Sequence, residues 1–516
     1  MLGPLKQREL DRSVLVSLER LVPAGHFYRH LDATLDLSFV RDWVADLYAS
    51  GGRPSIDPVV FFRFQLVMFF EGIRSERKLM EDAQLNLAHR WYLGYHLDEP
   101  LPDRSSLIKI RQRLGLAIFR RFFEHILDLC DEAGLIWGKE VLADATKIQA
   151  NADLDSLKPR LQEVVDDHLV ALFGEEEHPQ EAKETGAGDD APRLLHPSTQ
   201  SSESDESTET DEQPSRWDVL EECRLDPTRP PSGAYERIGD RKISLTDFDA
   251  KPLTMSDGRS VLGYQDHYLV DGGKARIIPG TRLRVSFVTP GDVAENQVLV
   301  DQLRRTLFRR KLHPKRMIAD ARYGTAPNVR DIEELGIRAY IPLHEVDKAS
   351  PFFRHQDFTY DAERDGYACP QGEVLKLRGV DEGAERSIYR ARASVCNACP
   401  IKEQCTTSSQ GRVVSRSFHA AYLDRVRGYY ETEAYQKAMR KRGVWVEPLF
   451  AEAKQWHGLR RFRLRGLGNV NIEGLLVAAG QNLKRYLAAR GWGRRWAPGG
   501  ALQTASLVHW NAVRPV

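Results

Sequence analysis

Hydrophobic residues recur at helical spacing along the first quarter of the chain, which predicts a mostly helical region over residues 14–125. Asp57 before Pro58 is typical of a helix N-terminus, because the carboxylate caps free amides and proline fits the first turn. Ser75 and Ser105 are expected to cap two later helices with their hydroxyls. The clearest helices are predicted at 39–48, 58–70, 75–79 and 105–114.

These helices also carry basic residues, and two interpretations remain open. Several short helices with basic faces suit docking on DNA in the manner of a helix-turn-helix. A plain helical bundle with solvated arginines explains the same residues equally well.

The pattern changes to that of a strand at 139–150, where Val141 and Leu142 lead to a single carboxylate, Asp144. An isolated carboxylate in an apolar strand is costly unless it has partners. Asp144 is therefore expected either to be held by hydrogen bonds or to face a metal ion.

A second carboxylate follows a short buried strand predicted at 317–319. Asp320 ends this strand, and Gly324 is expected to permit the turn that comes next. The carboxyl end of a central strand is where open α/β sheets place their ligand sites. Before it, strands are predicted at 265–271 and 281–290 and a helix at about 293–311.

A third acidic candidate lies on a helix within residues 444–466. Glu447 and Lys454 are seven positions apart and therefore share a helix face. An ordinary surface helix with solvated charges gives the same pattern. Cations separated by apolar residues follow the helix, an arrangement that suits a phosphate backbone: Arg460, Arg461, Arg463 and Arg465.

Four of the six cysteines gather in residues 346–418, which read as a separate small module. Their spacing is C-x26-C-x2-C-x5-C, and four thiolates can hold a tetrahedral zinc ion. The alternative is a set of four reduced, partly buried thiols, which is what we expect of Cys130 and Cys223. The four candidate ligands are Cys369, Cys396, Cys399 and Cys405.

The net charge of zero hides an uneven distribution over the 516 residues. Residues 161–220 contain 17 Asp and Glu against 3 Lys and Arg, which leaves 71 basic and 57 acidic residues elsewhere. We expect a largely disordered insert at about 173–215, acting as a spacer or as a DNA mimic. The basic remainder favours a polyanionic partner. No apolar run reaches membrane-spanning length, which predicts a cytoplasmic protein without a membrane partner.

Asp144, Asp320 and Glu447 are far apart in the sequence but could meet in space. Carboxylates can hold two divalent cations, which activate a water or a 3′-hydroxyl and stabilise the leaving oxygen in phosphodiester cleavage. Glu452 is the rival third acid. It lies about 140° around the helix from Glu447, so the two cannot both face the metals.

Together and in order, these motifs resemble those of DDE-type insertion-sequence transposases. Asp144-Ala-Thr-Lys-Ile-Gln-Ala is similar to the first-Asp motif of that family, and Ala-Asp320-Ala-Arg-Tyr-Gly is similar to the second. Val-Glu447-Pro-Leu-Phe with Lys454 resembles the third-acid signature, in which a Tyr and an Arg commonly precede the Glu. Tyr435 and Arg442 are the matching candidates, with Arg440 competing for the arginine position.

The resemblance implies a mixed α/β fold: an RNase H-like catalytic core, an all-α N-terminal domain and a small zinc-binding insertion. The implied catalytic and metal-binding residues are Asp144, Asp320 and Glu447 around two Mg²⁺ or Mn²⁺ ions. The expected boundaries are a DNA-binding domain at 1–135, a first part of the core at 136–345, a cysteine-rich insertion at 346–418 with structural Zn²⁺, and a second part of the core at 419–516.

The implied activity is binding of the element ends, strand cleavage and strand transfer, by a homodimer on double-stranded element-end and target DNA in the nucleoid. Phosphate contacts near the cut are expected from Lys454, Arg460, Arg461, Arg463 and Arg465, with Tyr435 and Arg442. Two other functions stay open: a catalytically silent DNA-binding protein derived from a transposase, and an RNase H-like nuclease that cleaves RNA in hybrids.

Overall fold

The computed structural model describes residues 13–49, 51–52, 54–159, 242–278, 288–343 and 351–493. The acidic insert expected at 173–215 and Cys223 lie outside the described residues. The strand expected at 281–290 is described only at its end.

The N-terminal region is helical, as predicted. Asp57 caps α4 by accepting a hydrogen bond from Val59 N (2.9 Å), and Ser75 caps α5. The cap predicted at Ser105 is wrong. Asp103 Oδ1 accepts from Ser105 N (2.7 Å) instead, so the cap lies two residues earlier and α7 begins at Arg104. The helices are α1 (Leu18–Leu21), α2 (Phe27–Thr34), α3 (Phe39–Val44), α4 (Pro58–Glu71), α5 (Glu76–Leu85), α6 (Leu87–Leu93) and α7 (Arg104–Glu132).

A six-stranded mixed sheet forms the centre of the molecule, with strand order β4-β5-β1-β7-β8 and β6 paired to β5. The predicted strand around Asp144 is confirmed as the central strand β1. It runs antiparallel to β5 and parallel to β7, and β7 runs parallel to β8. The strands are β1 (Glu140–Gln149), β4 (Lys251–Thr254), β5 (Ser260–Asp271), β6 (Val288–Pro290), β7 (Arg316–Ile318) and β8 (Arg338–Tyr340); β2 (Leu157–Pro159) and β3 (Lys242–Ser244) pair separately.

Alternate side chains of β1 enter two different cores. Leu142 and Ile148 belong to a core shared with α16 and α17, whereas Val141 and Ala143 pack with α10 and α11. The helix predicted at 293–311 begins later than expected, at Leu299. Gln297 Oε1 accepts from Ala294 N (2.9 Å) and closes a separate 3-10 turn, η4 (Glu295–Gln297), before the helix. The two helices are α10 (Leu299–Arg310) and α11 (Ala326–Glu334).

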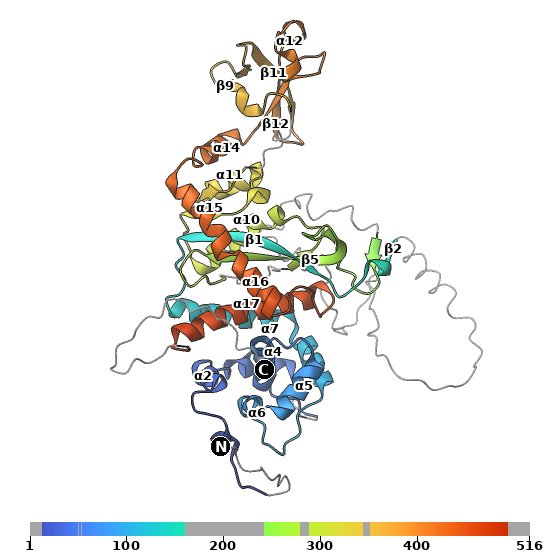
Figure 1. Cartoon of the computed structure of the whole chain (residues 1–516), viewed down its shortest axis with the longest axis vertical. Coiled ribbons are helices and arrows are strands. Elements are labelled where there is room, and N and C mark those ends of the chain that lie inside the picture. Colours follow the sequence, from blue (N-terminus) through green and yellow to red (C-terminus); the bar gives the residue numbers. More distant parts are fainter. Residues whose placement is uncertain are drawn as a thin grey trace, which may run out of the picture.

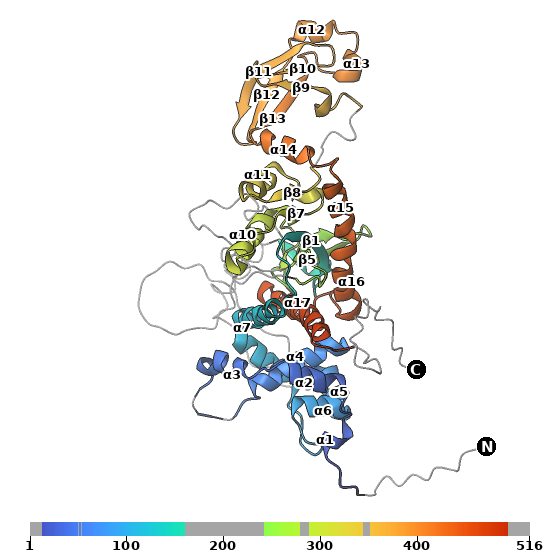
Figure 2. The same cartoon turned by 90° about the vertical axis from the view of Figure 1, so that its left-hand side faces the viewer.

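The N-terminal helices and the last described helix, α17, share one core. In Figures 1 and 2, α17 (Leu467–Ala489) lies along α7 between the sheet and the remaining N-terminal helices. Gly480 of α17 allows this approach, since a Cβ at that position would lie 2.5 Å from three ring atoms of Phe69 on α4. Among the described helices, none is long and apolar enough to cross a membrane.

The cysteine-rich segment forms a module of its own at one end of the molecule, beyond α14 (Ala420–Arg427) (Figures 1 and 2). Its five antiparallel strands follow the order β13-β12-β11-β10-β9 around a small core with Tyr367 and Tyr389. Its elements are β9 (Thr359–Asp361), β10 (Gly366–Ala368), β11 (Val374–Asp381), β12 (Arg386–Arg390), α12 (Ala393–Asn397), α13 (Lys402–Cys405) and β13 (Val413–Ser417).

After the module, α15 (Glu433–Trp445) and α16 (Glu447–Trp456) cross the sheet in front of β1 and β5 (Figure 1). Pro448 lies in the first turn of α16. Proline has no amide hydrogen and its ring clashes with the carbonyl four residues earlier, so it interrupts a continuous helix but fits the first turn of a new one. The chain therefore breaks at Val446, which places Glu447 at the beginning of a new helix.

Candidate active site

The carboxylates of Asp144 and Asp320 extend from neighbouring parallel strands. Leu142 of β1 pairs with Ile318 of β7, and each acid lies two residues beyond its member of this pair. Adjacent strands are about 4.8 Å apart, so the two positions are side by side. At this separation the negative charge of Asp320 raises the pKa of Asp144.

Asp144 is nearly buried, with 13% of its side chain exposed. Arg442 Nη1 of α15 donates to Asp144 Oδ2 (3.0 Å), and Ala145 N donates to Oδ1 (2.9 Å). Burial raises the pKa of Asp144 to about 6, although Arg442 and the amide of Ala145 act in the opposite direction. The metal-free site therefore holds this negative charge at a cost.

Asp320 caps a short 3-10 helix, η5 (Ala321–Tyr323), by accepting from Arg322 N (2.9 Å). The expected role of Gly324 needs correction. Its φ of −78° is open to any residue, so the turn does not require glycine. Close packing does, because a Cβ here would lie 2.2 Å from the carbonyl oxygen of Pro342.

Glu447 is exposed and forms no hydrogen bond or ion pair with any residue that the structure describes. Its neighbours on both sides contact the Asp144 region. Arg442, five residues earlier, bonds to Asp144. Phe450, three residues later, packs on Tyr268 with 4.5 Å between ring centroids, and Tyr268 is the cross-strand partner of Asp144. Glu447 therefore begins α16 over the same part of the sheet.

Glu452, the rival third acid, faces α17 instead of β1. It forms ion pairs with Lys484 and, at 3.5 Å, with Arg485, both on α17. Burial alone would raise the pKa of Glu452, but His457, whose Nε2 lies 3.8 Å from Oε1, and these two cations hold it far below its ordinary value. Glu452 thus joins α16 to α17, and Glu447 is the one of the two whose carboxylate has no such partner.

Glu295 is an acidic residue near the site that sequence reasoning missed. It is 7% exposed and forms an ion pair with Arg322 (2.8 Å). Burial raises its pKa, Arg322 opposes the rise, and Asp320 adds to it. Glu295 also raises the pKa of Asp144. The only signal for Glu295 in the sequence is its place shortly after a strand. It follows a turn that contains Pro and Gly, and such a turn does not predict that a residue is buried.

The two residues expected before the third acid differ in their placement. Arg442 contacts Asp144, whereas the competing Arg440 is exposed, so Arg442 is the one of the two that lies at the carboxylate of Asp144. Tyr435 is buried between Tyr340 and Tyr430, with ring centroids 5.5 and 5.0 Å away. Burial raises its pKa, and its ring supports the packing of α15 against β8.

Comparison with protein families matches two parts of the chain. Residues 16–113 match a family model described as a transposase domain (DUF772), and residues 368–487 match one described as a transposase DDE domain. Both matches support a DDE-type insertion-sequence transposase. The second match includes Glu447, while Asp144 and Asp320 lie between the two matches. No curated protein and no solved structure matches.

The arginine segment of the transposase is anchored to the end of β1. Arg461 Nε donates to the carbonyl of Ala150 (3.2 Å), and Arg465 Nε donates to that of Asn151 (3.0 Å). Both side chains remain exposed, as does Arg460.

Arg463 differs from its neighbours, because it pairs with the buried carboxylate of Glu76. Burial raises the pKa of Glu76, but Arg463 and Arg111 lower it to about 2. Arg463 thus connects this segment to α5, and its positive charge is already neutralised within the protein.

Lys454 lies beside Asp266, which is fully buried on β5. Burial raises the pKa of Asp266 to about 8, and Lys454 lowers it only in part. Burial also lowers the pKa of Lys454, while Asp266 raises it. The ammonium of Lys454 is therefore held over the sheet two turns along α16 from Glu447.

The four cysteines of the module lie within electrostatic reach of one another. Burial raises the pKa of Cys405, Arg412 lowers it, and the other three thiols raise it again. Yet neither these thiols nor the acids form a ready metal cage: the described ranges contain no group of three or more His, Cys, Asp or Glu placed to hold a metal ion. The four residues are Cys369, Cys396, Cys399 and Cys405.

Proposed function

We propose that this transposase cleaves DNA at the ends of an insertion sequence and joins the released ends to target DNA, with Asp144, Asp320 and Glu447 as its catalytic residues. The observation that carries the proposal is the adjacency of Asp144 and Asp320 on parallel strands beneath α15 and α16. The strand order, with β1 central, supports an RNase H-like core.

The donor set suits a hard divalent cation. Asp144, Asp320 and Glu295 repel one another, and a cation such as Mg²⁺ relieves that repulsion. Two bound Mg²⁺ or Mn²⁺ ions would supply an activated nucleophile and stabilise the leaving oxygen. We assign Asp144, Asp320 and Glu447 as their ligands, with Arg442 balancing the charge of Asp144 until the ions bind.

Two in-line displacements at phosphorus make up the reaction. In the first, the oxygen of water bonds to phosphorus, the P–O3′ bond breaks, and the 3′ oxygen leaves with the electron pair and takes up a proton. In the second, that 3′-hydroxyl attacks a phosphodiester of the target and releases the target's own 3′ oxygen. We assign contacts with the DNA backbone to the exposed cations beyond α16, Arg460, Arg461 and Arg465, and to Lys454 on α16 itself.

A nicking assay on supercoiled DNA that carries the sequences flanking the coding region tests the proposal. The unmodified chain should nick this DNA with Mg²⁺ or Mn²⁺, and Asp320→Asn and Glu447→Gln should each abolish nicking while end binding persists. Near-normal nicking by either variant would remove that residue from the site. Binding without nicking by the unmodified chain would favour a silent DNA-binding protein.

We also propose that the four cysteines of the module hold a structural zinc ion, on the strength of their C-x26-C-x2-C-x5-C spacing, and that the thiols draw together when the ion binds. The purified protein should contain one zinc per chain, and Cys399→Ser should lose it together with thermal stability of the module. If the wild-type protein as purified contains no zinc and its module unfolds at the same temperature as that of the variant, the assignment is wrong.

A further inference from the structure

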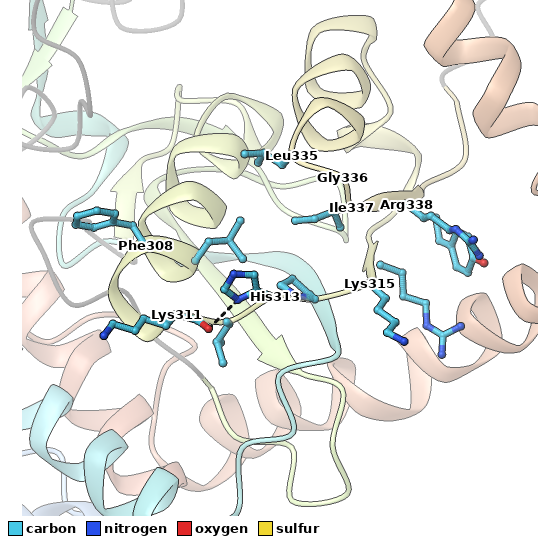
Figure 3. A pocket seen from close by; sticks show the side chains of 13 residues that line it. Phe308, Lys311, His313, Lys315, Leu335, Gly336, Ile337 and Arg338 are labelled. Carbon is cyan, nitrogen blue, oxygen red and sulfur yellow. Dashed lines mark hydrogen bonds between the residues drawn. The ribbon is translucent and has the colours of Figure 1, made fainter.

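A second candidate site lies at the opposite end of the parallel strands from the acids. A cavity of about 980 Å³ opens where β7 and β8 begin, between the C-terminal ends of α10 and α11 (Figure 3). Phe308 and Lys311 lie on one flank of this cavity, and Lys315 and Arg338 lie on the other.

The lining of this cavity is strongly cationic. Lys311, Lys315, Arg316 and Arg338 border it, and no Asp or Glu is among the described residues that do. Lys311, Lys315 and Arg338 are exposed, and none of them forms an ion pair with a residue in the described part of the chain. Arg316 is the exception, 3.7 Å from Glu140.

Helix dipoles account for part of this charge but not for all of it. The C-termini of α10 and α11 each carry roughly −0.5 of an elementary charge, which favours cations nearby. Glu140 offsets a further positive charge at Arg316. Four cations against about two negative charges leave an excess of roughly two positive charges, enough to attract an anionic ligand.

An exposed aromatic ring accompanies the cations. Phe308 is 80% exposed at the rim, and Leu335, which also lines the cavity, is 39% exposed. Unpaired cations beside an exposed aromatic ring are typical of surfaces that follow a nucleic-acid backbone and stack a base. A simple anion would use the charges and leave Phe308 without a role.

We propose that this cavity binds the sugar-phosphate backbone of DNA that extends beyond the cut, with Phe308 against an adjacent base or sugar. The proposal rests on the proposed function, because it assumes that DNA lies at Asp320. Lys315 and Asp320 belong to one extended segment and are separated by roughly 16 Å, five residues at about 3.3 Å each. That is less than one helical turn of duplex, about 34 Å, so one DNA molecule can reach both.

The salt dependence of DNA binding measures the phosphate contacts of the cavity. The probes are a labelled 40-base-pair duplex of random sequence and its single strand, since backbone contacts do not depend on sequence. Combined replacement Lys311→Gln, Lys315→Gln and Arg338→Gln should reduce the magnitude of the negative slope of log K against log salt by about 3. The matched control is Lys376→Gln, Arg378→Gln and Arg390→Gln, three exposed cations of the cysteine-rich module.

An unchanged slope in the cavity variant, or an equal loss in the control, would overturn the proposal. Nicking by the unmodified chain is measured in parallel. If it binds and nicks while the cavity variant keeps its full slope, only the cavity proposal fails. If the unmodified chain binds neither probe, the proposed function fails as well.

Photo-crosslinking locates the contact directly. A benzoylphenylalanine in place of Phe308 should attach to the DNA probe, whereas the same residue in place of Phe418, 49% exposed on the module side, should not. Attachment to a second copy of the chain or to another segment of the same chain, with DNA bound but unlabelled, would show that the cavity receives a protein and would overturn the proposal.

Discussion

Replacing Asp144 with asparagine should stabilise the metal-free protein. The folded chain raises the pKa of Asp144 from its ordinary 3.8 to about 6, chiefly through burial. At about 1.4 kcal/mol per unit, this shift corresponds to about 3 kcal/mol against the charged form. Asparagine has nearly the same shape and no charge, so Asp144→Asn should remove this penalty apart from the cost of one lost hydrogen bond, because its amide nitrogen cannot accept from Arg442 or Ala145.

The pH dependence follows from the same shift. Below about pH 3.8 the carboxyl is protonated in both states, and the variant has no advantage. As pH rises toward 6 the unfolded chain ionises first, so the wild type loses stability relative to the variant. Above about pH 6 the difference is complete, and it should reach up to about 3 kcal/mol.

Thermal unfolding in chelator at pH 4 and pH 8 tests this reasoning. The variant should unfold a few degrees higher than the wild type at pH 8 and at nearly the same temperature at pH 4. Asp257→Asn is the matched control, because Asp257 is exposed and a hydrogen bond from Arg259 lowers its pKa. A variant less stable than the wild type at pH 8, or equally shifted at both pH values, would refute the account of Asp144.

Three further substitutions probe other parts of the account. Arg463→Ala should cost about 2 kcal/mol of unfolding free energy in denaturant melts, because it breaks the ion pair with Glu76, and should leave the salt dependence of DNA binding unchanged. Arg460→Ala should leave the unfolding free energy unchanged and reduce the magnitude of the slope of log K against log salt by about 1. Gly480→Ala should destabilise by about 1 to 3 kcal/mol in the same melts despite alanine's better helix propensity, since the new methyl clashes with Phe69. Glu295→Gln should weaken Mn²⁺ binding in calorimetry by roughly tenfold, and an unchanged affinity would place Glu295 outside the site.

Local patterns predicted the elements, because side-chain periodicity and capping act over a few residues. The helices at 39–48 and 58–70, the strand around Asp144 and the short strand before Asp320 all follow from such patterns, within a few residues at their ends. The cap at Asp103 does not follow from the sequence, because two candidates, Asp103 and Ser105, lie only two residues apart and only the backbone shows which one is used.

Contacts between distant segments could not be predicted from the sequence. The register of β1 against β7, which brings Asp144 and Asp320 together, depends on the pairing of whole strands. The ion pair between Arg463 and Glu76 joins residues that are 387 positions apart. Glu295 was overlooked because no local pattern shows that its turn folds against Asp320.

Binding of Mn²⁺ to a crystalline complex of the transposase with cleaved element-end DNA tests the central claim most directly. Anomalous diffraction locates the metal without reference to the protein atoms. The account predicts Mn²⁺ bound by carboxylate oxygens of both Asp144 and Asp320, at roughly the 2.1 Å typical of such ligands, with Glu447 completing the site. Metal peaks away from these residues, or a Glu447 carboxylate that stays out of reach with DNA in place, would contradict it.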